Sequence, residues 1–303
     1  MHENKILLTT REASSILGVH DSSIKRWCDR GRLECDVTAG GHRRISLDAL
    51  VRFATRESFA APLLALDRYA SEVWSATDRF RSGDGGELVD LSFGWMDSGP
   101  EEHLAALLQF MLDQGFAAER LADLLLGPLV RRIGREWERG CIGVGDEHRM
   151  TQVLLDALYE IRGRRRRPTA APTAIVATSE GNRHELGAQM VRLVLERGPW
   201  RVVYLGADVP TAEIVVQQRR HEASLVCLSF VSPQIPSDVY RVVDMLAATY
   251  NDEAPFRVAV GGAGASGTSL ESDLFPFTDI RLFERIEPFS QWAADILSLN
   301  QRG

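Results

Sequence analysis

Short apolar runs alternate with helix-periodic stretches along the C-terminal part of the chain. The apolar runs predict strands at residues 173–178, 201–205, 225–229, 257–260 and 279–283. The stretches between and after them predict helices at 185–197, 212–221, 238–250, near 268–274 and at 289–299. Strands that alternate with helices form a parallel, doubly wound sheet, so we expect a Rossmann-like α/β domain of flavodoxin-type strand order. Ligands of such sheets bind at the carboxyl ends of the strands.

Amphipathic helical patterns fill the middle of the chain and are separated by turns rich in glycine and proline. They cover residues 63–80, 88–95, 101–112, 119–139 and 147–162. Short connections between helices predict an antiparallel bundle of about four helices, with a kink at Gly127-Pro128. By pattern alone, such a bundle is equally a dimerisation spacer. The arginine-rich run at 162–168 is interpreted as a solvated linker, with an auxiliary phosphate contact as the alternative.

The N-terminal residues have the pattern of two short helices followed by a hairpin. Helices are expected at 9–18 and 24–30, and strands at 33–37 and 43–46 flank a glycine turn. This order predicts a winged helix-turn-helix, whose second helix and wing contact DNA. The candidate contacts are polar and basic residues of those two elements: Ser22, Ser23, Lys25, Arg26, His42, Arg43 and Arg44. The alternative is a small helical domain with solvated charges, and in either case Trp27 is expected in the core.

These patterns divide the 303 residues into segments 1–53, 54–168 and 169–303. The net charge of −7 gives no general affinity for nucleic acid, whereas residues 1–53 carry nine Lys or Arg against seven Asp or Glu, a net of +2. DNA contact would therefore come from a local patch. The four cysteines lack paired spacing, which argues against a disulfide framework or zinc site and fits a reducing cytoplasm. No signal peptide or membrane-spanning apolar run is visible, so we expect a soluble cytoplasmic protein.

Unusual residues follow three of the predicted strands. They are Asn182, His184 and Gly187 after the first strand, Ser229 and Ser232 after the third, and Gly261 and Gly262 after the fourth. Small residues at these ends predict a deep slot, and the glycine run does not match the dinucleotide pattern G-x-G-x-x-G. His184 lies in a strand-to-helix loop, from which an imidazole can reach a metal. The plainer alternative is a loop histidine near a helix N-terminus.

Trp137, Glu147 and His148 bracket a glycine-rich loop at residues 140–145. Periodicity favours a core position for the indole, because it continues an i, i+4 ladder formed by Leu125, Leu129 and Ile133. A lone helical histidine is usually solvated or hydrogen-bonded. Alternatively, the indole, carboxylate and imidazole together cover the flat face of a large ring and hydrogen-bond a polar group on it.

The N-terminal segment resembles the winged helix-turn-helix of the MerR superfamily. This resemblance rests on residues 8–13, 17–19, 24–27, 31–33 and 40–44. The C-terminal segment resembles the B12-binding domain of methionine synthase and related corrinoid proteins, whose loop reads Asp-x-His-x-x-Gly. In that family the histidine replaces the vitamin's own base as lower ligand to cobalt, which implies this role for His184. The displaced nucleotide tail enters a slot, which implies a lining by Ser229, Gly261 and Gly262.

The chain departs from that motif at Asn182, where the family usually has a carboxylate. The metal-binding imidazole needs an acceptor for its second ring nitrogen, and we expect the side-chain oxygen of Asn182 to accept from His184. An uncharged acceptor makes the imidazole less basic and the cobalt–histidine bond weaker. Glu180 is the alternative acceptor.

The three segments in this order resemble the CarH-type photoreceptor repressors, which are B12-dependent transcriptional regulators. The resemblance implies adenosylcobalamin held between bundle and B12 domain, with Trp137, Glu147 and His148 around the adenosyl group. Methylcobalamin or another tetrapyrrole is the alternative cofactor. It also implies a homo-oligomer, a tetramer or a dimer, that binds a double-stranded DNA operator in the dark. It further implies that light breaks the cobalt–carbon bond and that the operator is then released.

A second departure concerns the light response. Some members have a histidine directly after the tryptophan, which caps cobalt once the adenosyl group has left, whereas this chain has Glu138. A light-independent sensor of cobalamin or another tetrapyrrole is therefore the alternative function. A corrinoid carrier domain of a methyltransferase or mutase is disfavoured, because a DNA-binding segment and no catalytic barrel accompanies the B12-like segment. We expect no enzymatic activity.

Overall fold

The computed structural model describes residues 6–59, 61–162 and 171–300. The chain divides into two compact units, residues 1–117 with 124–153 and residues 118–123 with 154–303. Residues 163–168 of the predicted basic linker lie outside the described residues. Among the helices in the described ranges, none is both long enough and apolar enough to span a membrane.

The N-terminal residues form a helix-turn-helix with a small antiparallel sheet. Its elements are β1 (Leu7–Leu8), α1 (Thr10–Leu17), α2 (Asp21–Asp29), β2 (Asp36–Val37), β3 (Arg43–Ser46) and α3 (Leu47–Arg56). β3 lies between β1 and β2 and is antiparallel to both. The predicted helix pair and hairpin wing are confirmed. β1 and α3 were not predicted, and α3 runs across the boundary expected at residue 53.

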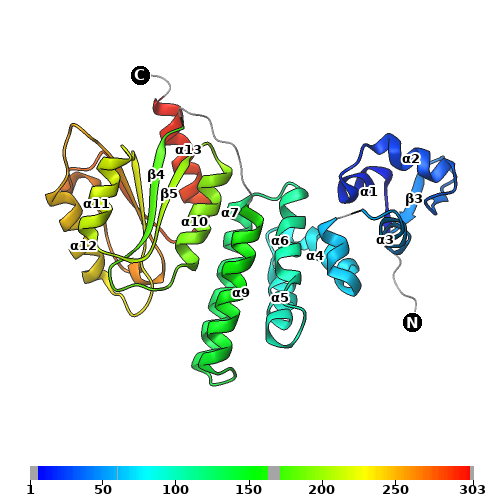
Figure 1. The fold of residues 1–303 in the computed structure, drawn as a ribbon, viewed down its shortest axis with the longest axis horizontal. Helices are drawn as coiled ribbons and strands as arrows, with labels where there is room; N and C mark the ends of the chain where they lie inside the picture. The colour runs from blue at the N-terminus through cyan, green and yellow to red at the C-terminus, as the bar shows by residue number, and fades with distance from the viewer. Residues whose placement is uncertain (1–5, 60, 163–170, 301–303) are drawn as a thin grey trace. The chain divides into compact units, whose positions relative to one another are not determined.

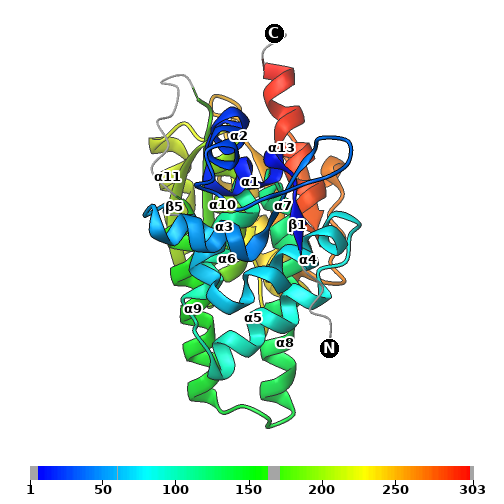
Figure 2. The same cartoon turned by 90° about the vertical axis from the view of Figure 1, so that its right-hand side faces the viewer.

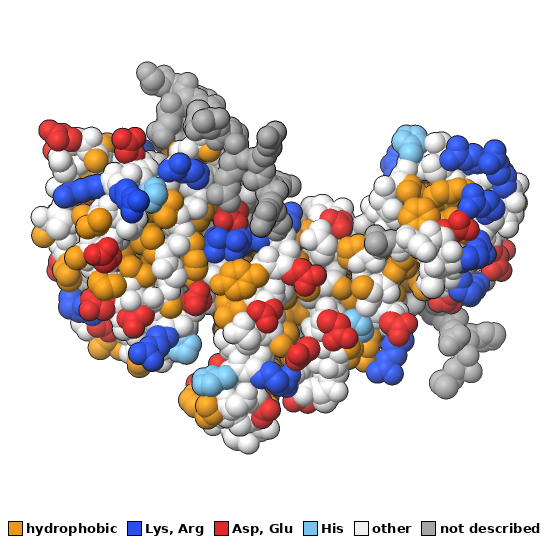
Figure 3. Space-filling model, viewed as in Figure 1, with side chains coloured by type: hydrophobic (Ala, Val, Ile, Leu, Met, Phe, Trp, Pro, Cys, Tyr) orange, Lys and Arg blue, Asp and Glu red, His pale blue; other side chains and the backbone are white. Residues whose placement is uncertain are grey.

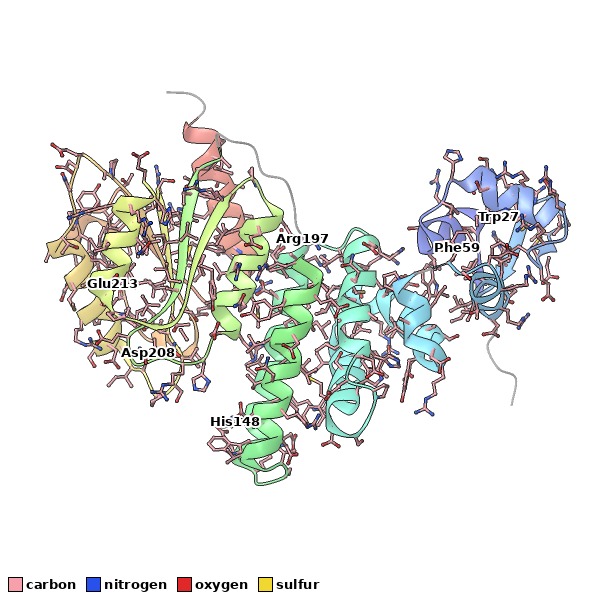
Figure 4. All side chains as sticks on the ribbon, viewed as in Figure 1. Trp27, Phe59, His148, Arg197, Asp208 and Glu213 are labelled. Carbon is pink, nitrogen blue, oxygen red and sulfur yellow. The ribbon has the colours of Figure 1, made fainter. Side chains whose placement is uncertain are left out.

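Local sequence explains where these helices begin and how they pack. Thr9 and Glu12 form a capping box at α1, in which Thr9 Oγ1 accepts from the Glu12 amide at 3.2 Å and the Glu12 carboxylate accepts from the Thr9 amide at 2.6 Å. The half-buried Trp27 ring of α2 packs against Phe53 of α3 and against Phe59, with ring centroids 5.0 and 5.6 Å apart (Figure 4). This confirms the predicted packing role of Trp27.

Helices fill the middle of the chain. They are η1 (Pro62–Tyr69, a 3-10 helix), α4 (Ala70–Arg81), α5 (Gly86–Ser98), α6 (His103–Asp113), α7 (Ala118–Leu121), a π-helical turn (Ala122–Leu126), α8 (Gly127–Glu138) and α9 (Val144–Arg162). The single helix expected at 63–80 is split, because Asp67 has a φ of 48° that breaks regular helix. The irregularity expected at Gly127-Pro128 occurs one turn earlier, as the π-helical turn. Figure 2 shows the loop that joins α8 to α9 at one end of the bundle.

The C-terminal part contains the predicted parallel sheet. Its strands are β4 (Thr173–Ser179), β5 (Arg201–Val209), β6 (Leu225–Ser229), β7 (Arg257–Gly261) and β8 (Ile280–Phe283). Neighbouring strands are parallel in the order β5-β4-β6-β7-β8, which confirms the predicted flavodoxin-type order. β5 extends four residues beyond its predicted end and shifts register against β4 after Val176.

Two helical layers cover this sheet (Figure 1). They consist of α10 (Leu186–Arg197) with α13 (Ile286–Asn300), and α11 (Thr211–Arg220) with α12 (Pro236–Ala248). Alternate side chains of each strand enter opposite cores, so Ile175 packs in the α11–α12 core and Val176 packs in the α10–α13 core. The helix expected near 268–274 is only a 3-10 turn at Ser272–Leu274. The carboxyl edge between these layers is where the candidate residues lie.

Candidate functional site

The loop after β4 is held to the end of β6 by one buried amide. Asn182 is 2 % exposed, and its Nδ2 donates to the carbonyl oxygen of Ser229 at 3.0 Å. Its Oδ1 accepts from the backbone amide of His184 at 2.9 Å. The expectation that this oxygen accepts from the His184 ring is therefore corrected, because the oxygen receives the backbone N–H instead. Asn182 therefore holds the loop in place. Glu180, the alternative acceptor for the imidazole, is exposed.

A second set of hydrogen bonds holds the same loop and comes from Asp208 at the end of β5. Asp208 has a φ of 55°, and its Oδ1 accepts from the Gly181 amide at 2.7 Å. The Asp208 amide donates to Thr178 Oγ1 at 2.9 Å and to the Asn182 carbonyl at 2.8 Å. Figure 4 shows Asp208 at this edge of the sheet. Sequence reasoning assigned no role to Asp208 or Thr178, because their partners are far away along the chain.

This support leaves the imidazole of His184 free. The side chain is exposed, and within the part of the chain that the structure describes no hydrogen bond or ion pair of its ring is recorded. A neutral imidazole without a competing partner can act as a ligand to a metal. The described residues contain no group of three or more His, Cys, Asp or Glu side chains that could hold a metal ion.

Gly187 and Ser229 lie against each other beside this loop. A Cβ at Gly187 would come within 2.7 Å of Ser229 Oγ, so a larger residue there would force the hydroxyl to move. The hydroxyl of Ser229 is buried and has no hydrogen-bond partner among the described residues. Burying a hydroxyl without a hydrogen bond costs free energy, and a polar group of a bound ligand can supply the missing bond. The pair therefore fits the slot expected at the carboxyl edge.

The glycines after β7 have a structural role in the same region. Gly262 has a φ of 97°, and a Cβ there would lie 2.2 Å from the carbonyl oxygen of Phe230. The Phe230 amide donates to the Gly261 carbonyl at 2.8 Å. Close backbone packing alone therefore explains why residue 262 is a glycine. Ser232 is exposed in the neighbouring loop.

Sequence reasoning also missed Gln234, which is buried below this loop. Its Nε2 donates to Ser179 Oγ at 2.7 Å and to the Glu180 carbonyl at 3.2 Å. Its Oε1 accepts from the Val231 amide at 3.3 Å. Gln234 thus joins the loop after β6 to the end of β4. A glutamine in a loop carries no pattern from which this contact could be predicted.

Trp137 lies in the last turn of α8, and Glu147 and His148 lie in the first turns of α9, all in the same compact unit. Trp137 is 48 % exposed, so the core packing that periodicity favoured is wrong. The ladder residues before it, Leu125, Leu129 and Ile133, are buried. Glu147 Oε2 lies 2.6 Å from His148 Nδ1, and Glu147 Oε1 accepts from Thr151 Oγ1 at 3.0 Å. Figures 3 and 4 show hydrophobic side chains exposed beside His148 at this end.

The candidate DNA contacts lie on α2 and β3. Ser22, Lys25, Arg26 and His42 are exposed, whereas Ser23, Arg43 and Arg44 are half-buried. Two basic residues have acidic partners on α2: Lys25 Nζ is 2.5 Å from Asp21, and Arg43 pairs with Asp29. Hydrogen bonds from Lys25 and then Thr10 hold the pKa of Asp21 below its ordinary value. Lys and Arg side chains gather over this part of the chain in Figure 3.

Family models match three parts of the chain. The chain matches the helix-turn-helix domain over residues 7–58. It matches two families described as B12 binding domains, over residues 96–162 and 172–281. The first of these covers part of the bundle with Trp137, Glu147 and His148, and the second covers His184 with the strand ends.

A curated relative shares part of this sequence. Over 148 residues the chain is 33 % identical to the HTH-type transcriptional repressor CarA of Myxococcus xanthus. The match covers 48 % of this chain and 48 % of the relative, so the chain spans about half the length of that protein.

Solved structures with some likeness are corrinoid or cobalamin proteins. The monomethylamine corrinoid protein of Methanosarcina barkeri has 17 % identity and a TM-score of 0.47 over 65 % of this chain and 95 % of its own. A cobalamin-binding protein from Desulfitobacterium hafniense has 18 % identity and a TM-score of 0.35 over 74 % and 97 %. The domain matches and the sequence identity confirm the predicted resemblance. The chain thus matches a helix-turn-helix domain followed by two B12 binding domains, and it is similar over part of its length to a helix-turn-helix transcriptional repressor.

Proposed function

We propose that the chain is a cobalamin-binding transcriptional regulator that responds to light. The observation that carries this proposal is the His184 loop. Asn182 and Asp208 fix its backbone, while the exposed His184 ring remains without a recorded partner among the described residues. A rigid loop that presents a free imidazole suits a single axial ligand to a metal already held by a macrocycle.

The residues around the loop fit a corrinoid. We assign His184 as the lower ligand to cobalt and Ser229, Ser232, Gly261 and Gly262 to the slot for the nucleotide tail. The unpartnered hydroxyl of Ser229 would gain a hydrogen bond from that tail. Gly187 leaves room for the hydroxyl. Asn182 positions the ligand by holding the backbone of the loop.

Three residues of the helical bundle are proposed to contact the bound cofactor. Trp137 offers a half-exposed indole, which can lie flat against a ring. Glu147 and His148 form a hydrogen-bonded pair at the start of α9, with His148 largely exposed. When bound, adenosylcobalamin supplies a cobalt–carbon bond that visible light can break. Trp137, Glu147 and His148 would orient the adenosyl group and exclude water from it.

DNA binding would follow from α2 and the wing. A single helix-turn-helix makes few base contacts, so linked copies raise the effective concentration at an operator and sharpen occupancy. We therefore propose that the chain acts as a homo-oligomer, a tetramer or dimer, and that cofactor state changes its assembly. The CarA relative is named a transcriptional repressor, and we propose repression for this chain.

A light-independent sensor of cobalamin or another tetrapyrrole is the second candidate. The observation that favours it is Glu138, which is exposed directly after Trp137. A carboxylate is a poorer replacement ligand for a cobalt–imidazole centre than a second imidazole. The photoproduct would then lack a protein-derived upper ligand at this position.

Gel-shift assays on a duplex that the protein selects from a random pool test both candidates. The full chain is assayed in the dark and after illumination, with and without adenosylcobalamin. The light-responsive proposal predicts a shift that requires cobalamin in the dark and is lost on illumination. A cobalamin-dependent shift that survives illumination would favour the second candidate. A shift indifferent to cobalamin would contradict both.

A further inference from the structure

The helix-turn-helix contains two cysteines that the fold brings together. Cys28 lies in the last turn of α2, and Cys35 directly precedes β2. Between them the chain reverses, because the Cys28 carbonyl accepts from Gly31 and the Trp27 carbonyl accepts from both Arg32 and Leu33. The Arg43–Asp29 ion pair and the pairing of Asp36 with Arg44 place the end of α2 beside the start of β2, and both cysteines are half-buried.

A positive charge lies beside this dithiol. The guanidinium of Arg43 pairs with Asp29, the residue after Cys28, and interacts electrostatically with both thiols. A nearby guanidinium stabilises a thiolate and so promotes its oxidation. Burial, and then the hydrogen bond with Cys35, raises the pKa of Cys28 to about 12. Cys28 therefore stays protonated at neutral pH, and we assign the first attack on the oxidant to the other cysteine of the pair.

We propose that Cys28 and Cys35 are an oxidant-sensitive modification site, whose disulfide ties the second helix to the wing and weakens DNA binding. Hydrogen peroxide is the oxidant we name. The Cys35 thiolate attacks one peroxide oxygen, the O–O bond breaks, and the leaving hydroxide takes a proton to become water. The Cys28 thiol then attacks the resulting sulfenic sulfur, the S–S bond forms, and a second water leaves with the Cys28 proton. Two thiols are oxidised and one peroxide is reduced.

The expected effect on DNA follows from the position of the pair. A disulfide shortens the sulfur–sulfur separation from a contact to a bond of about 2.05 Å. This shortening draws the end of α2 toward β2 and disturbs the neighbouring Asp29–Arg43 pair. Arg43 is a candidate DNA contact, so this part of the inference rests on the proposed DNA-binding function. Disturbing one arginine contact should weaken binding about tenfold.

Thiol trapping of the full chain tests the modification. The reduced protein is treated with hydrogen peroxide, alkylated with N-ethylmaleimide and digested with trypsin. We expect residues 27–30 and 33–43 to be recovered as one disulfide-linked product. The exposed Cys141 provides the matched control, because Cys141→Ser should leave that product unchanged while Cys28→Ser and Cys35→Ser abolish it. Recovery of Cys28 and Cys35 both alkylated after peroxide would overturn the proposal.

Binding to a duplex selected by the reduced protein tests the consequence. We expect the Kd to rise about tenfold on oxidation, to recover with dithiothreitol, and to stay constant in Cys35→Ser. An unchanged Kd despite a mapped disulfide would refute the regulatory role alone. If the reduced protein selects no duplex, the proposed DNA-binding function fails, whereas the peptide mapping still decides the disulfide.

Discussion

The side chain of Asn182 donates to the carbonyl oxygen of Ser229 at 3.0 Å and so joins the His184 loop to the end of β6. Because Asn182 is 2 % exposed, a carboxylate in its place would face that carbonyl without water. We therefore expect Asn182→Asp to lower the free energy of unfolding by about 1–3 kcal/mol at neutral pH. Chemical denaturation monitored by circular dichroism measures the change.

The pH dependence of this variant provides a control. Burial raises the pKa of an introduced carboxyl group, and the protonated acid can donate to the Ser229 carbonyl as the amide does. The destabilisation of Asn182→Asp should therefore shrink as the pH falls, whereas that of Asn182→Ala should follow the wild type. Equal stability of Asn182→Asp and wild type at pH 7 would show that the bond does not hold the loop.

A larger residue at Gly187 should destabilise the protein while Ser229 is present. A Cβ at Gly187 would lie 2.7 Å from Ser229 Oγ but 3.8 Å from Ser229 Cβ. We expect Gly187→Ala to destabilise the protein by about 1–3 kcal/mol through overpacking. The double variant Gly187→Ala/Ser229→Ala should regain most of this, since the clashing oxygen is gone. Thermal unfolding measures the stability of the two single variants and of the double variant. If the two single stability changes simply add in the double variant, the steric contact is disproved.

Trp137 should matter for the cofactor more than for stability. Its indole is 48 % exposed, so we expect Trp137→Ala to change the unfolding free energy by less than about 1 kcal/mol. Retention of adenosylcobalamin on gel filtration should fall. Leu129, which is fully buried on the same helix, is the matched control and should lose about 2–5 kcal/mol as Leu129→Ala. Full cofactor retention by Trp137→Ala would remove the indole from the site.

The second helix should lose support in acid. Hydrogen bonds from Lys25 and then Thr10 lower the pKa of Asp21 from its ordinary 3.8. A carboxyl whose folded pKa is depressed contributes stability above its unfolded pKa and loses it as the pH falls through the folded pKa. NMR titration of the Asp21 carboxyl carbon should therefore give a midpoint below 3.8 in wild type and a higher one in Lys25→Gln. Identical midpoints would contradict the role of this ion pair.

The strands and their order could be predicted because their apolar, β-branched runs are buried on both faces. Ile175 and Val176 enter opposite cores, and such runs are typical of parallel sheets. Trp137 shows where periodicity fails. The ladder from Leu125 continues for one turn beyond the point at which the core ends, and a repeat in the sequence does not reveal where its packing partner stops.

The loop geometry could be predicted only in part. Candidate residues at the strand ends were found because parallel strands place their carboxyl ends at one edge. The contacts that fix the loop come from Asp208 and Gln234, which bond to Gly181 and Ser179 from distant positions in the sequence. The partner of the Asn182 oxygen was mispredicted because a backbone amide two residues away reaches it.

Electron paramagnetic resonance of the reconstituted protein tests the central claim most directly. The full chain is loaded with cobalamin in its paramagnetic cobalt(II) form, once unlabelled and once with ¹⁵N-histidine. If His184 is the lower ligand, the nitrogen splitting of the cobalt signal changes from triplet to doublet on labelling, and His184→Ala abolishes the change. A splitting that ignores the histidine label, with cobalamin bound, would contradict the assignment of His184 to cobalt.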